Sequence, residues 1–378
     1  QHGFLADELL EDLSRRRGVP RYHLEGLVSF YTHFRRTAPA PRTFAVCRDI
    51  ACAMHGGQAV GRALAKLAES HDTLDVTEVS CLGRCDSAPA IAVNDVAAGP
   101  VNPDVVDSLL DDDRVPWLHL QDEGQNWQSD PYERPSDHYS TATRLAGNLE
   151  KLTATCFERL QSAGLRGMGG AGFPTGRKWQ MVASESASPR YVICNADESE
   201  PGTFKDRVLL ASLPHLVIEG MLLAGLAIGA ERGIVFLRHE YEPERQVLQA
   251  ALDEARQRGV LGDDACRSGQ AFDIEIFVSP GGYILGEETA LLEALEDRRG
   301  EPRHKPPYPG QHGLNGQPTL INNVETFALA VSIIHHGADW WQQQGAEGFA
   351  GLKFVSISGD INQPGVYEVP VGTTVSTL

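Results

Sequence analysis

The sequence predicts an α/β protein with several successive units, and two patterns carry that prediction. Apolar residues near the N-terminus recur every three or four positions, as in amphipathic helices. Short apolar strands then alternate with helical segments in two separate blocks, as in sheets covered by helices. A chain of 378 residues commonly holds two or three domains. We therefore expect a helical segment at 1–38, a small α/β domain of thioredoxin size at 39–120, a linker at 121–140, a Rossmann-like, doubly wound domain at 141–350, and the start of a strand-rich unit at 351–378.

The first two units are assigned from short periodic segments. Residues 4–34 have helical spacing, and Gly18-Val19-Pro20 divides them into two helices that we expect to pack on a neighbouring part of the chain. A stiff Ala-Pro repeat then leads into the small α/β domain. Its strands are predicted at 43–46, 74–79 and 90–93, and its helix at 57–67. A polar stretch containing Trp and Pro is predicted to be the linker.

The larger unit repeats the alternation on a longer scale. A helix at 145–160 leads into a glycine-rich loop, and a long apolar helix precedes the strand at 234–237. Further strands are predicted at 191–194 and 272–278, and a helix at 287–296. This order implies a mostly parallel, doubly wound sheet. Strands at 353–358 and 365–369 then open a last unit that stops at Leu378, so we expect the natural chain to continue.

Composition excludes several classes of partner. The formal charge is −18, from 51 acidic and 33 basic residues, which argues against nucleic acid and anionic membrane surfaces. The most apolar stretch, residues 220–230, is shorter than the ~20 residues of a membrane span. The seven cysteines are odd in number and scattered, and no secretory signal opens the sequence. We expect a soluble, cytoplasmic protein without membrane insertion.

Four cysteines have the spacing of a metal cluster. Cys47-x4-Cys52 and Cys81-x3-Cys85 each fall on a loop at a strand end, among small residues. Four thiolates hold a [2Fe–2S] cluster, and small neighbours let backbone N–H groups approach its sulfurs. Zinc ribbons usually have tighter Cys-x2-Cys pairs, so zinc is the weaker alternative, and disulfides are unexpected in the cytoplasm. The remaining cysteines are expected to be core or surface thiols: Cys156, Cys194 and Cys266.

A glycine-rich loop at residues 167–176 is the first sign of a nucleotide site. Gly167-x-Gly169-x-x-Gly172 has the spacing of the dinucleotide fingerprint, and such loops bring backbone N–H groups close to a phosphate or a flat ring. The loop follows a helix rather than a strand, so an ordinary Rossmann turn is not predicted. Arg177-Lys178 supplies local positive charge that the acidic chain otherwise lacks.

Two acidic loops and two further turns complete the candidate site. Residues 195–200 follow a strand and Gly286-Glu287-Glu288 precedes a helix, so their carboxylates suit ribose hydroxyls and favour NAD over NADP. The alternative is that these acids only complement helix dipoles. The turn at 304–309 presents Lys305 and Tyr308 to a base and a phosphate. The amide pair Asn322-Asn323 suits a phosphate at a helix N-terminus, or is simply an N-cap.

Together these segments closely resemble the flavoprotein subunit of respiratory complex I and the diaphorase subunits of NAD-dependent formate dehydrogenases and NAD-reducing hydrogenases. The matching segments are residues 166–179, 195–207, 281–288, 303–309 and 318–326. The part with the four cysteines resembles the thioredoxin-like [2Fe–2S] subunit of the same complex. The resemblance covers nearly the whole chain. Both parts on one chain look like the fused β-subunit of a soluble formate dehydrogenase, or the comparable hydrogenase subunit.

The resemblance implies a role for each matching residue. Those implied to line FMN are Gly167, Gly169, Lys178, Asn195, Asp197, Gly286, Glu287, Ile321, Asn322, Asn323 and Thr326. Those implied to contact NAD(H) are Gly170, Ala171, Phe173, Glu200, Glu288, Lys305 and Tyr308. Glu198, in the same acidic loop, is a further candidate for cofactor binding. Glu200 and Glu288 are assigned the catalytic role of tuning the flavin and positioning water.

The resemblance also implies the activity and the partners. Hydride would pass between NAD(H) and FMN, and single electrons would pass to iron–sulfur clusters. The first expectation is the NAD-reducing subunit of a formate dehydrogenase, whose partner subunits carry further clusters and a metal catalytic site. A hydrogenase or respiratory NADH dehydrogenase subunit is the alternative, and a flavin-free assembly module is the alternative of another class. Residues 351–378 look like the start of a ubiquitin-like β-grasp domain, and a [4Fe–4S] cluster is expected only beyond Leu378.

Overall fold

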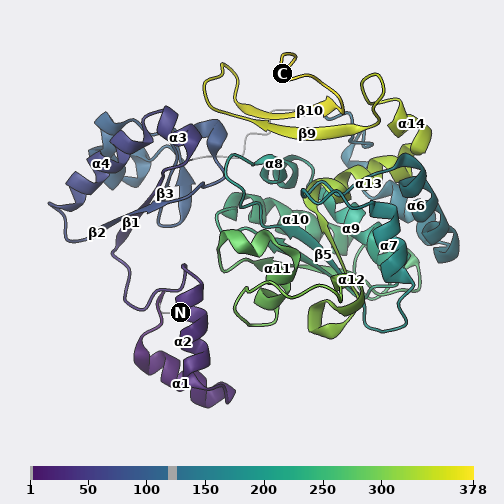
Figure 1. Ribbon diagram of the computed structural model, residues 1–378, viewed down its shortest axis with the longest axis horizontal. Helices are drawn as coiled ribbons and strands as arrows, with labels where there is room; N and C mark the ends of the chain where they lie inside the picture. The colour runs from purple at the N-terminus through teal and green to yellow at the C-terminus, as the bar shows by residue number, and fades with distance from the viewer. Residues whose placement is uncertain (1–2, 118–125) are drawn as a thin grey trace.

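A helical hairpin forms the N-terminal part of the computed structural model, which describes residues 3–117 and 126–378. Helix α1 (Asp7–Arg17) ends at Gly18, whose φ of 64° lets its amide turn back to the Ser14 carbonyl. Helix α2 (Arg21–Phe30) follows, and the two bury Leu10 and Val28 between them. The hairpin of α1 and α2 lies at the N-terminal end of the ribbon in Figure 1, and Tyr31, the residue after α2, is buried in the core of the larger domain. The predicted hairpin, packed on a neighbour, is confirmed.

The small α/β domain is a four-stranded sheet with the order β2-β1-β3-β4. The strands β1 and β2 are parallel, and the other pairs are antiparallel. Its strands are β1 (Arg42–Cys47), β2 (Leu74–Val79), β3 (Ile91–Val93) and β4 (Val96–Ala98), and its helices are α3 (Ile50–Met54), α4 (Gly57–Ala68), η1 (Cys85–Ser87), η2 (Pro103–Leu110) and η3 (Asp112–Arg114). All the predicted elements are present. The short elements α3 and β4 were not predicted, because each falls below the length at which periodicity can be read.

The larger domain is built on a four-stranded, fully parallel sheet with the order β7-β6-β5-β8. Its strands are β5 (Tyr191–Ala196), β6 (Arg232–Leu237), β7 (Asp273–Val278) and β8 (Thr319–Asn323). The chain moves from β5 toward β7 on one side and returns to place β8 on the other. This reversal is the point at which open parallel sheets bind ligands, at the carboxyl ends of the strands.

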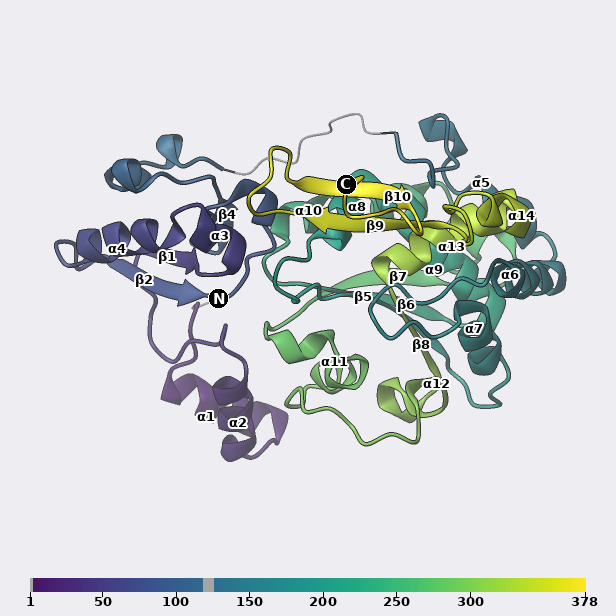
Figure 2. The same ribbon diagram turned by 45° about the horizontal axis from the view of Figure 1, so that its top comes forward.

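Helices cover both faces of this sheet, as a doubly wound fold requires (Figure 2). One face carries α5 (Ser140–Ala146), α6 (Leu149–Ala163), α7 (Thr175–Ala183), α8 (Lys205–Ser212), α9 (Pro214–Ile228), α10 (Glu242–Gln257), α13 (Val324–His336) and α14 (Ala338–Gln342). The other carries η6 (Tyr283–Gly286), α11 (Glu288–Leu295), α12 (Pro309–His312) and η7 (Leu314–Gly316), while η4 (Pro135–Asp137) and η5 (Ala265–Arg267) lie in connections.

One predicted helix is two helices in the structure. The expected helix at 145–160 is divided between α5 and α6. Asn148 has an extended backbone at the break, and its side chain accepts a hydrogen bond of 2.9 Å from the Lys151 amide. Asparagine with this geometry starts a helix, so the chain ends α5 and begins α6 here. The apolar spacing continued across the break and concealed it.

The expected linker is packed against the large domain in its second half. Residues 121–125 lie outside the described residues. Trp127 is buried and meets the Phe354 ring edge-on, with centroids 5.2 Å apart. Phe354 belongs to an antiparallel hairpin formed by β9 (Leu352–Ile357) and β10 (Gly365–Pro370). This hairpin matches the expected strands at 353–358 and 365–369, and the β-grasp assignment stays a prediction.

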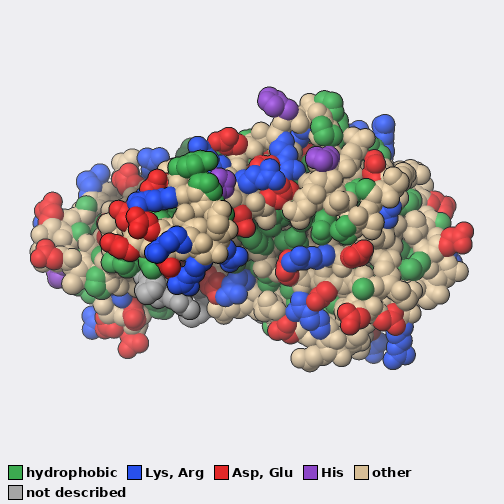
Figure 3. All heavy atoms as spheres, turned by 90° about the horizontal axis from the view of Figure 1, so that it is seen from below, with side chains coloured by type: hydrophobic (Ala, Val, Ile, Leu, Met, Phe, Trp, Pro, Cys, Tyr) green, Lys and Arg blue, Asp and Glu red, His purple; other side chains and the backbone are tan. Residues whose placement is uncertain are grey.

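No single helix in the described part of the chain is long and apolar enough to cross a membrane, although the bent pair α8 and α9, at 95° to one another, passes a test of length and composition. Acidic and basic side chains are interspersed on the face shown in Figure 3.

Candidate functional site

A cavity of about 700 Å³ opens at the carboxyl ends of β5 and β8. That volume is in the range of sites for cofactors and other small molecules. Segments from both sides of the sheet meet there. Most of the predicted cofactor residues line it, namely Gly167, Gly169, Ala171, Phe173, Lys178, Asn195, Gly286, Glu287, Glu288, Lys305, Tyr308, Ile321, Asn322, Asn323 and Thr326.

The glycine-rich loop forms one wall of the cavity. The two ends of the loop are held together by the backbone. The Gly167 amide donates to the Phe173 carbonyl at 2.9 Å, and Arg166 and Pro174 form an isolated antiparallel β-bridge. The loop is also fixed to α13 by a hydrogen bond of 2.9 Å from the Met168 amide to Thr326 Oγ1. The N–H groups of residues 169–173 have no hydrogen-bond partner within the described chain. They are therefore available to a ligand with acceptor oxygens.

Glycine is required at the closest approach within this wall. A Cβ on Gly169 would lie 3.2 Å from the Cβ of Asn323, so a side chain there would press on the amide turn. Gly170 and Gly172 have φ angles of 111° and 63°, which side chains rarely adopt. The loop therefore holds its backbone against the cavity at a distance that other residues would not permit.

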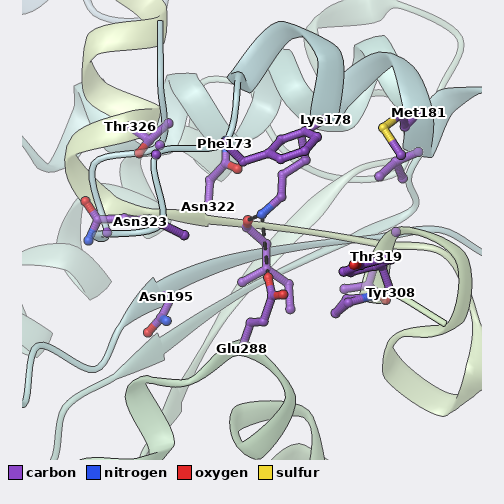
Figure 4. Close-up of a pocket in the computed structure, with 18 of the residues that line it drawn as sticks. Phe173, Lys178, Met181, Asn195, Glu288, Tyr308, Thr319, Asn322, Asn323 and Thr326 are labelled. Atoms are coloured by element: carbon purple, nitrogen blue, oxygen red, sulfur yellow. Dashed lines mark hydrogen bonds and ion pairs between the residues drawn. The ribbon is translucent and has the colours of Figure 1, made fainter. Parts of the chain in front are cut away.

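Lys178 places a positive charge inside the cavity from α7. Its Nζ donates to the Ile321 carbonyl at 2.7 Å and lies 3.6 Å from the Glu288 carboxylate. Burial lowers the pKa of Lys178, with Glu288 acting in the opposite direction. Figure 4 shows Phe173, Lys178 and Met181 on the α7 side, opposite Glu288. This ion pair lines the cavity, so a polar ligand bound there can hydrogen-bond to the ammonium or to the carboxylate.

The acidic residues at the start of α11 have a structural role as well as a place in the cavity. The Glu287 carboxylate accepts hydrogen bonds from the amides of Thr289 and Ala290, at 2.8 and 3.0 Å. Lys305 contacts both Glu287 and Glu288 at 2.8 Å. The alternative of a helix N-cap is thus realised for Glu287. The capping also fixes the carboxylate at the rim of the cavity.

Two asparagines hold neighbouring loops at the carboxyl edge of the sheet. Asn195 donates to the Gly286 carbonyl at 2.9 Å and accepts from the Asp197 amide at 3.2 Å. Asn323 caps α13 by accepting from the Glu325 amide at 3.1 Å. The N-cap alternative is therefore realised for Asn323, while its neighbour Asn322 lines the cavity.

Four predicted cofactor residues are outside the cavity lining: Gly170, Asp197, Glu198 and Glu200. Glu198 caps α8, accepting from the amides of Asp206 and Arg207, and it also accepts from the Tyr241 hydroxyl. Its side chain is therefore engaged with α8 and Tyr241 rather than with the cavity lining, and its assignment to cofactor binding stays a prediction. Glu200 is exposed and accepts a hydrogen bond from the Tyr283 hydroxyl. Gly170 is exposed on the glycine-rich loop.

Asp197, another of these four, is a buried acid with a raised pKa. Burial raises its pKa to about 7, with Arg238 acting in the opposite direction. One carboxylate oxygen, Oδ2, is buried without a hydrogen-bond partner among the described residues. Because Asp197 lies outside the cavity lining, its assignment to FMN stays a prediction.

Seven lining residues were not among those individually assigned to FMN or NAD(H): Gly172, Arg177, Met181, Val182, Pro309, Gly310 and Thr319. A signal for some of them was present. Met181 and Val182 follow Lys178 by three and four positions, so all three share one face of α7. The others adjoin predicted residues in the same loops.

A second site lies in the small domain, where all four predicted cysteines are buried free thiols. Cys47 ends β1 and Cys52 lies in α3, while Cys81 and Cys85 flank the loop before η1. The sulfurs of Cys81 and Cys85 are 3.2 Å apart. The amides of Gly83 and Ala90 point at the sulfurs of Cys81 and Cys52, at 3.3 and 3.4 Å. Four thiols with converging N–H donors fit a [2Fe–2S] cluster. Cys156 and Cys194 are core thiols, and Cys266 is half-buried.

The two sites are joined by a buried polar network. Arg238, which follows β6, donates to the carbonyls of both Cys81 and Glu198. Tyr241 packs against Gly83 and donates to Glu198 at 3.0 Å. Residues 195–198 therefore connect the two sites: Asn195 lines the cavity, and the Glu198 carbonyl shares Arg238 with the carbonyl of Cys81.

A parallel sheet with a ligand cavity at its point of reversal, joined to a four-thiol pocket, defines a class of redox proteins that pair a nucleotide or flavin site with an iron–sulfur cluster. Comparison with known families identifies both parts. Residues 160–332 match the Nuo51 FMN-binding domain, and residues 1–114 match the thioredoxin-like [2Fe–2S] ferredoxin family.

Individual relatives agree with both matches. The chain is 35% identical to the NAD-reducing hydrogenase HoxS subunit alpha of Cupriavidus necator, over 100% of this chain and 67% of that protein. It is 51% identical to an NADH-quinone oxidoreductase subunit of Aquifex aeolicus, over 56% of this chain and 49% of that protein. A crystal structure of an NAD⁺-reducing [NiFe]-hydrogenase has a TM-score of 0.83 at 32% identity, covering 96% of this chain and 65% of that one.

The chain therefore belongs to the family of fused diaphorase subunits, in which a thioredoxin-like [2Fe–2S] domain precedes a Nuo51-type FMN-binding domain. It spans about half to two thirds of the length of the relatives named above.

Proposed function

We propose that this chain is the electron-input module of an NAD-dependent oxidoreductase, exchanging hydride between NAD(H) and FMN and single electrons with a [2Fe–2S] cluster. The observation that carries the proposal is that the cavity and the four-thiol pocket are connected through residues 195–198 and Arg238, which hydrogen-bonds to the carbonyl of Cys81. Both family matches support it.

The residues of the cavity fit FMN. Unpaired amides of the glycine-rich loop and the Lys178 ammonium suit the phosphate and the ring carbonyls, and the Asn195 side chain, which lines the cavity, suits a ribityl hydroxyl. Bound there, FMN supplies a ring that accepts a hydride and gives up the two electrons one at a time. The chain's own contribution is to hold this ring and to exclude water from it by means of the apolar residues Met181, Val182 and Ile321.

NAD(H) would bind at the mouth of the same cavity. Phe173 and Tyr308 are 39% and 55% exposed there, and exposed aromatic rings at a rim provide faces on which a base stacks. Lys305 is held at the rim by Glu287 and Glu288, where its charge is available to a pyrophosphate. Gly170 has no side chain and Ala171 has only a methyl group on this side, which leaves room for the dinucleotide.

Glu288 and Glu200 are proposed to act on the reacting rings in different ways. Glu288 lies inside the cavity beside Lys178, where its charge opposes the build-up of negative charge on a reduced ring. Glu200 is exposed beside Tyr283 and would meet the nicotinamide side. Replacing Glu200 with Gln is expected to change the flavin midpoint potential or the NADH kinetics. If both stay at the wild-type value, the role of Glu200 is refuted.

The comparisons favour a hydrogenase over a formate dehydrogenase as the complex that contains this chain. The relatives named above are a subunit of an NAD-reducing hydrogenase and a subunit of an NADH-quinone oxidoreductase, and the hydrogenase subunit aligns with this whole chain. We therefore propose the hydrogenase alternative in place of the formate dehydrogenase expectation. Co-purification of a nickel-containing partner would support it, and a molybdenum- or tungsten-containing partner would contradict it.

The activity is tested on anaerobically purified protein. We expect flavin fluorescence after denaturation, stoichiometric iron and sulfide, and bleaching of the flavin absorbance on addition of NADH. A colourless protein that binds neither flavin nor iron after reconstitution would support the assembly-module alternative. Zinc in place of iron and sulfide would contradict the [2Fe–2S] assignment while leaving the flavin site in place.

A further inference from the structure

Two histidines and a glutamate converge outside both sites described above. One potential ligand atom from each of His138, His215 and Glu254 lies within 4.8 Å of the others. They come from three separate segments, since His138 precedes α5, His215 lies in the first turn of α9, and Glu254 lies near the end of α10. All three are half-buried. The imidazole rings of the histidines are stacked, with centroids 3.9 Å apart.

A buried tyrosine contacts one ring nitrogen of His215. The Tyr139 hydroxyl lies 2.7 Å from His215 Nδ1 and 3.4 Å from the Ala251 carbonyl. In the tautomer with hydrogen on Nδ1, the hydroxyl accepts from Nδ1–H and donates to Ala251, and Nε2 carries a lone pair. Histidines that bind metals are commonly held in this way by a hydrogen bond on the other ring nitrogen.

The free lone pair faces a free carboxylate oxygen. His215 Nε2 lies 3.8 Å from Glu254 Oε2. The other oxygen of Glu254, Oε1, accepts a hydrogen bond from Arg258 at 3.2 Å, and Arg258 also donates to the His138 carbonyl at 3.0 Å. Arg258 thus fixes two of the three residues, although its positive charge opposes a cation nearby. His138 Nδ1 is buried without a hydrogen-bond partner among the described residues.

We propose that His138, His215 and Glu254 bind one divalent transition-metal ion of the Zn²⁺ type, with water as the fourth ligand. Two imidazoles and one carboxylate form a set that Zn²⁺ prefers. Ligand atoms around tetrahedral zinc are ~3.3 Å apart, so the three side chains must close by about 1.5 Å. The Glu254 side chain is 45% exposed, and its Oε2 already lies 3.8 Å from His215 Nε2, so these two ligands need to close by only about 0.5 Å.

Such a metal ion would join three segments that are distant in sequence. It would fix the end of the linker, at His138, to the start of α9 and the end of α10. Metal bound by the folded state alone stabilises that state, so zinc is expected to raise the melting temperature. Hydride transfer does not require this site.

The test is a zinc titration of the full chain, purified with its cluster and flavin, in competition with a coloured chelator. We expect one Zn²⁺ per chain beyond the iron of the cluster. Glu254→Gln and His215→Gln are each expected to weaken that binding by about tenfold or more. His336→Gln, at an exposed histidine on α13, is the matched control and is expected to bind as the wild type does.

Cobalt distinguishes this site from vacant cysteine thiols. Co²⁺ in the proposed site is expected to give visible d–d absorption without thiolate charge-transfer bands. Glu254→Gln changes a side chain that is half exposed, so a loss of binding with unchanged circular dichroism is not a loss of fold. Failure of the wild type to bind one equivalent, or equal binding by wild type and both variants, would overturn the proposal.

Discussion

At the scale of single residues, the partners of a buried polar atom indicate the role of its side chain most clearly. The sulfurs of the four-cysteine group receive backbone N–H groups, while Cys156 and Cys194 are surrounded by core side chains. Burial alone therefore does not separate ligands from structural thiols. The convergence of sulfurs and amide donors does.

Replacing Cys81 with Ser is expected to remove most of the bound iron and sulfide, because three thiolates and one hydroxyl hold the cluster poorly. Cys156→Ala, at an equally buried thiol in α6, serves as the control and should keep full iron content. Iron and acid-labile sulfide assays provide the measurement. Full iron content in the Cys81 variant would contradict the ligand assignment.

Lys178 is expected to contribute directly to flavin binding. Lys178→Met removes a cation that is partly buried in the cavity, and charged hydrogen bonds are worth roughly 1.5–3 kcal/mol, so FMN affinity should fall ~10- to 100-fold. Arg177→Met removes the neighbouring charge, which is exposed at the rim, and should have a smaller effect. Fluorescence titration of the deflavinated variants with FMN measures both. Equal losses in the two variants would show that the effect is one of overall charge.

Glu219 gives folding stability a defined dependence on pH. It is fully buried in α9, accepts hydrogen bonds from the Tyr132 hydroxyl and the Ala142 amide, and burial raises its pKa to about 7. Since this value lies above the 4.5 of an exposed glutamate, the folded state binds the proton more tightly. The resulting stabilisation is complete below about pH 4.5 and is lost as the pH rises through 7.

Between pH 5 and 8, the unfolding free energy of Glu219→Gln is therefore expected to fall by about 1–3 kcal/mol less than that of the wild type. Chemical denaturation at several pH values measures this decline. Glu150→Gln, at an exposed position of α6, is the control and should follow the wild-type profile. A Glu219 variant with the wild-type slope would show that other groups set the pH dependence.

At the scale of elements, a buried ion pair between the two α/β domains connects the start of η1 to α10. Arg84 and Glu244 form two parallel hydrogen bonds of 2.7 and 2.9 Å, and both side chains are almost completely buried. A buried pair of this kind is costly to break, because the remaining partner becomes an isolated buried charge. The position of the cysteine loop against α10 depends on it.

Arg84→Met is expected to destabilise the protein by about 3–5 kcal/mol, and the double variant Arg84→Met with Glu244→Leu should recover much of that loss. The measurement is the unfolding free energy of the three proteins. Arg42→Met, at a more exposed ion pair of the same domain, should cost much less. A double variant as unstable as the single one would mean that packing, rather than charge, is the source of the effect.

At the scale of the whole molecule, local patterns predicted most of the elements and failed where one pattern continued through a break. Strands such as β5, β6 and β7 contain apolar residues over four or more positions, which is a signal that does not depend on the rest of the chain. The break between α5 and α6 interrupts no apolar spacing, and Gly147 and Asn148 are the residues that mark it. The second half of the expected linker is polar by composition, but Trp127 is buried against Phe354.

The sequence by itself determined the order of the units, the parallel sheet, the four cysteines and most of the cavity lining. The order of the units, the parallel sheet and the cysteine group follow from local spacing, whereas the lining residues follow from the resemblance to the flavoprotein subunit of complex I and its relatives. Only the tertiary structure decided that Glu198 caps α8, that Met181 and Val182 face the cavity, and that His138, His215 and Glu254 converge. The physical reason is that a side chain's partners are selected by packing between distant segments, and periodicity reports only the face on which that side chain lies.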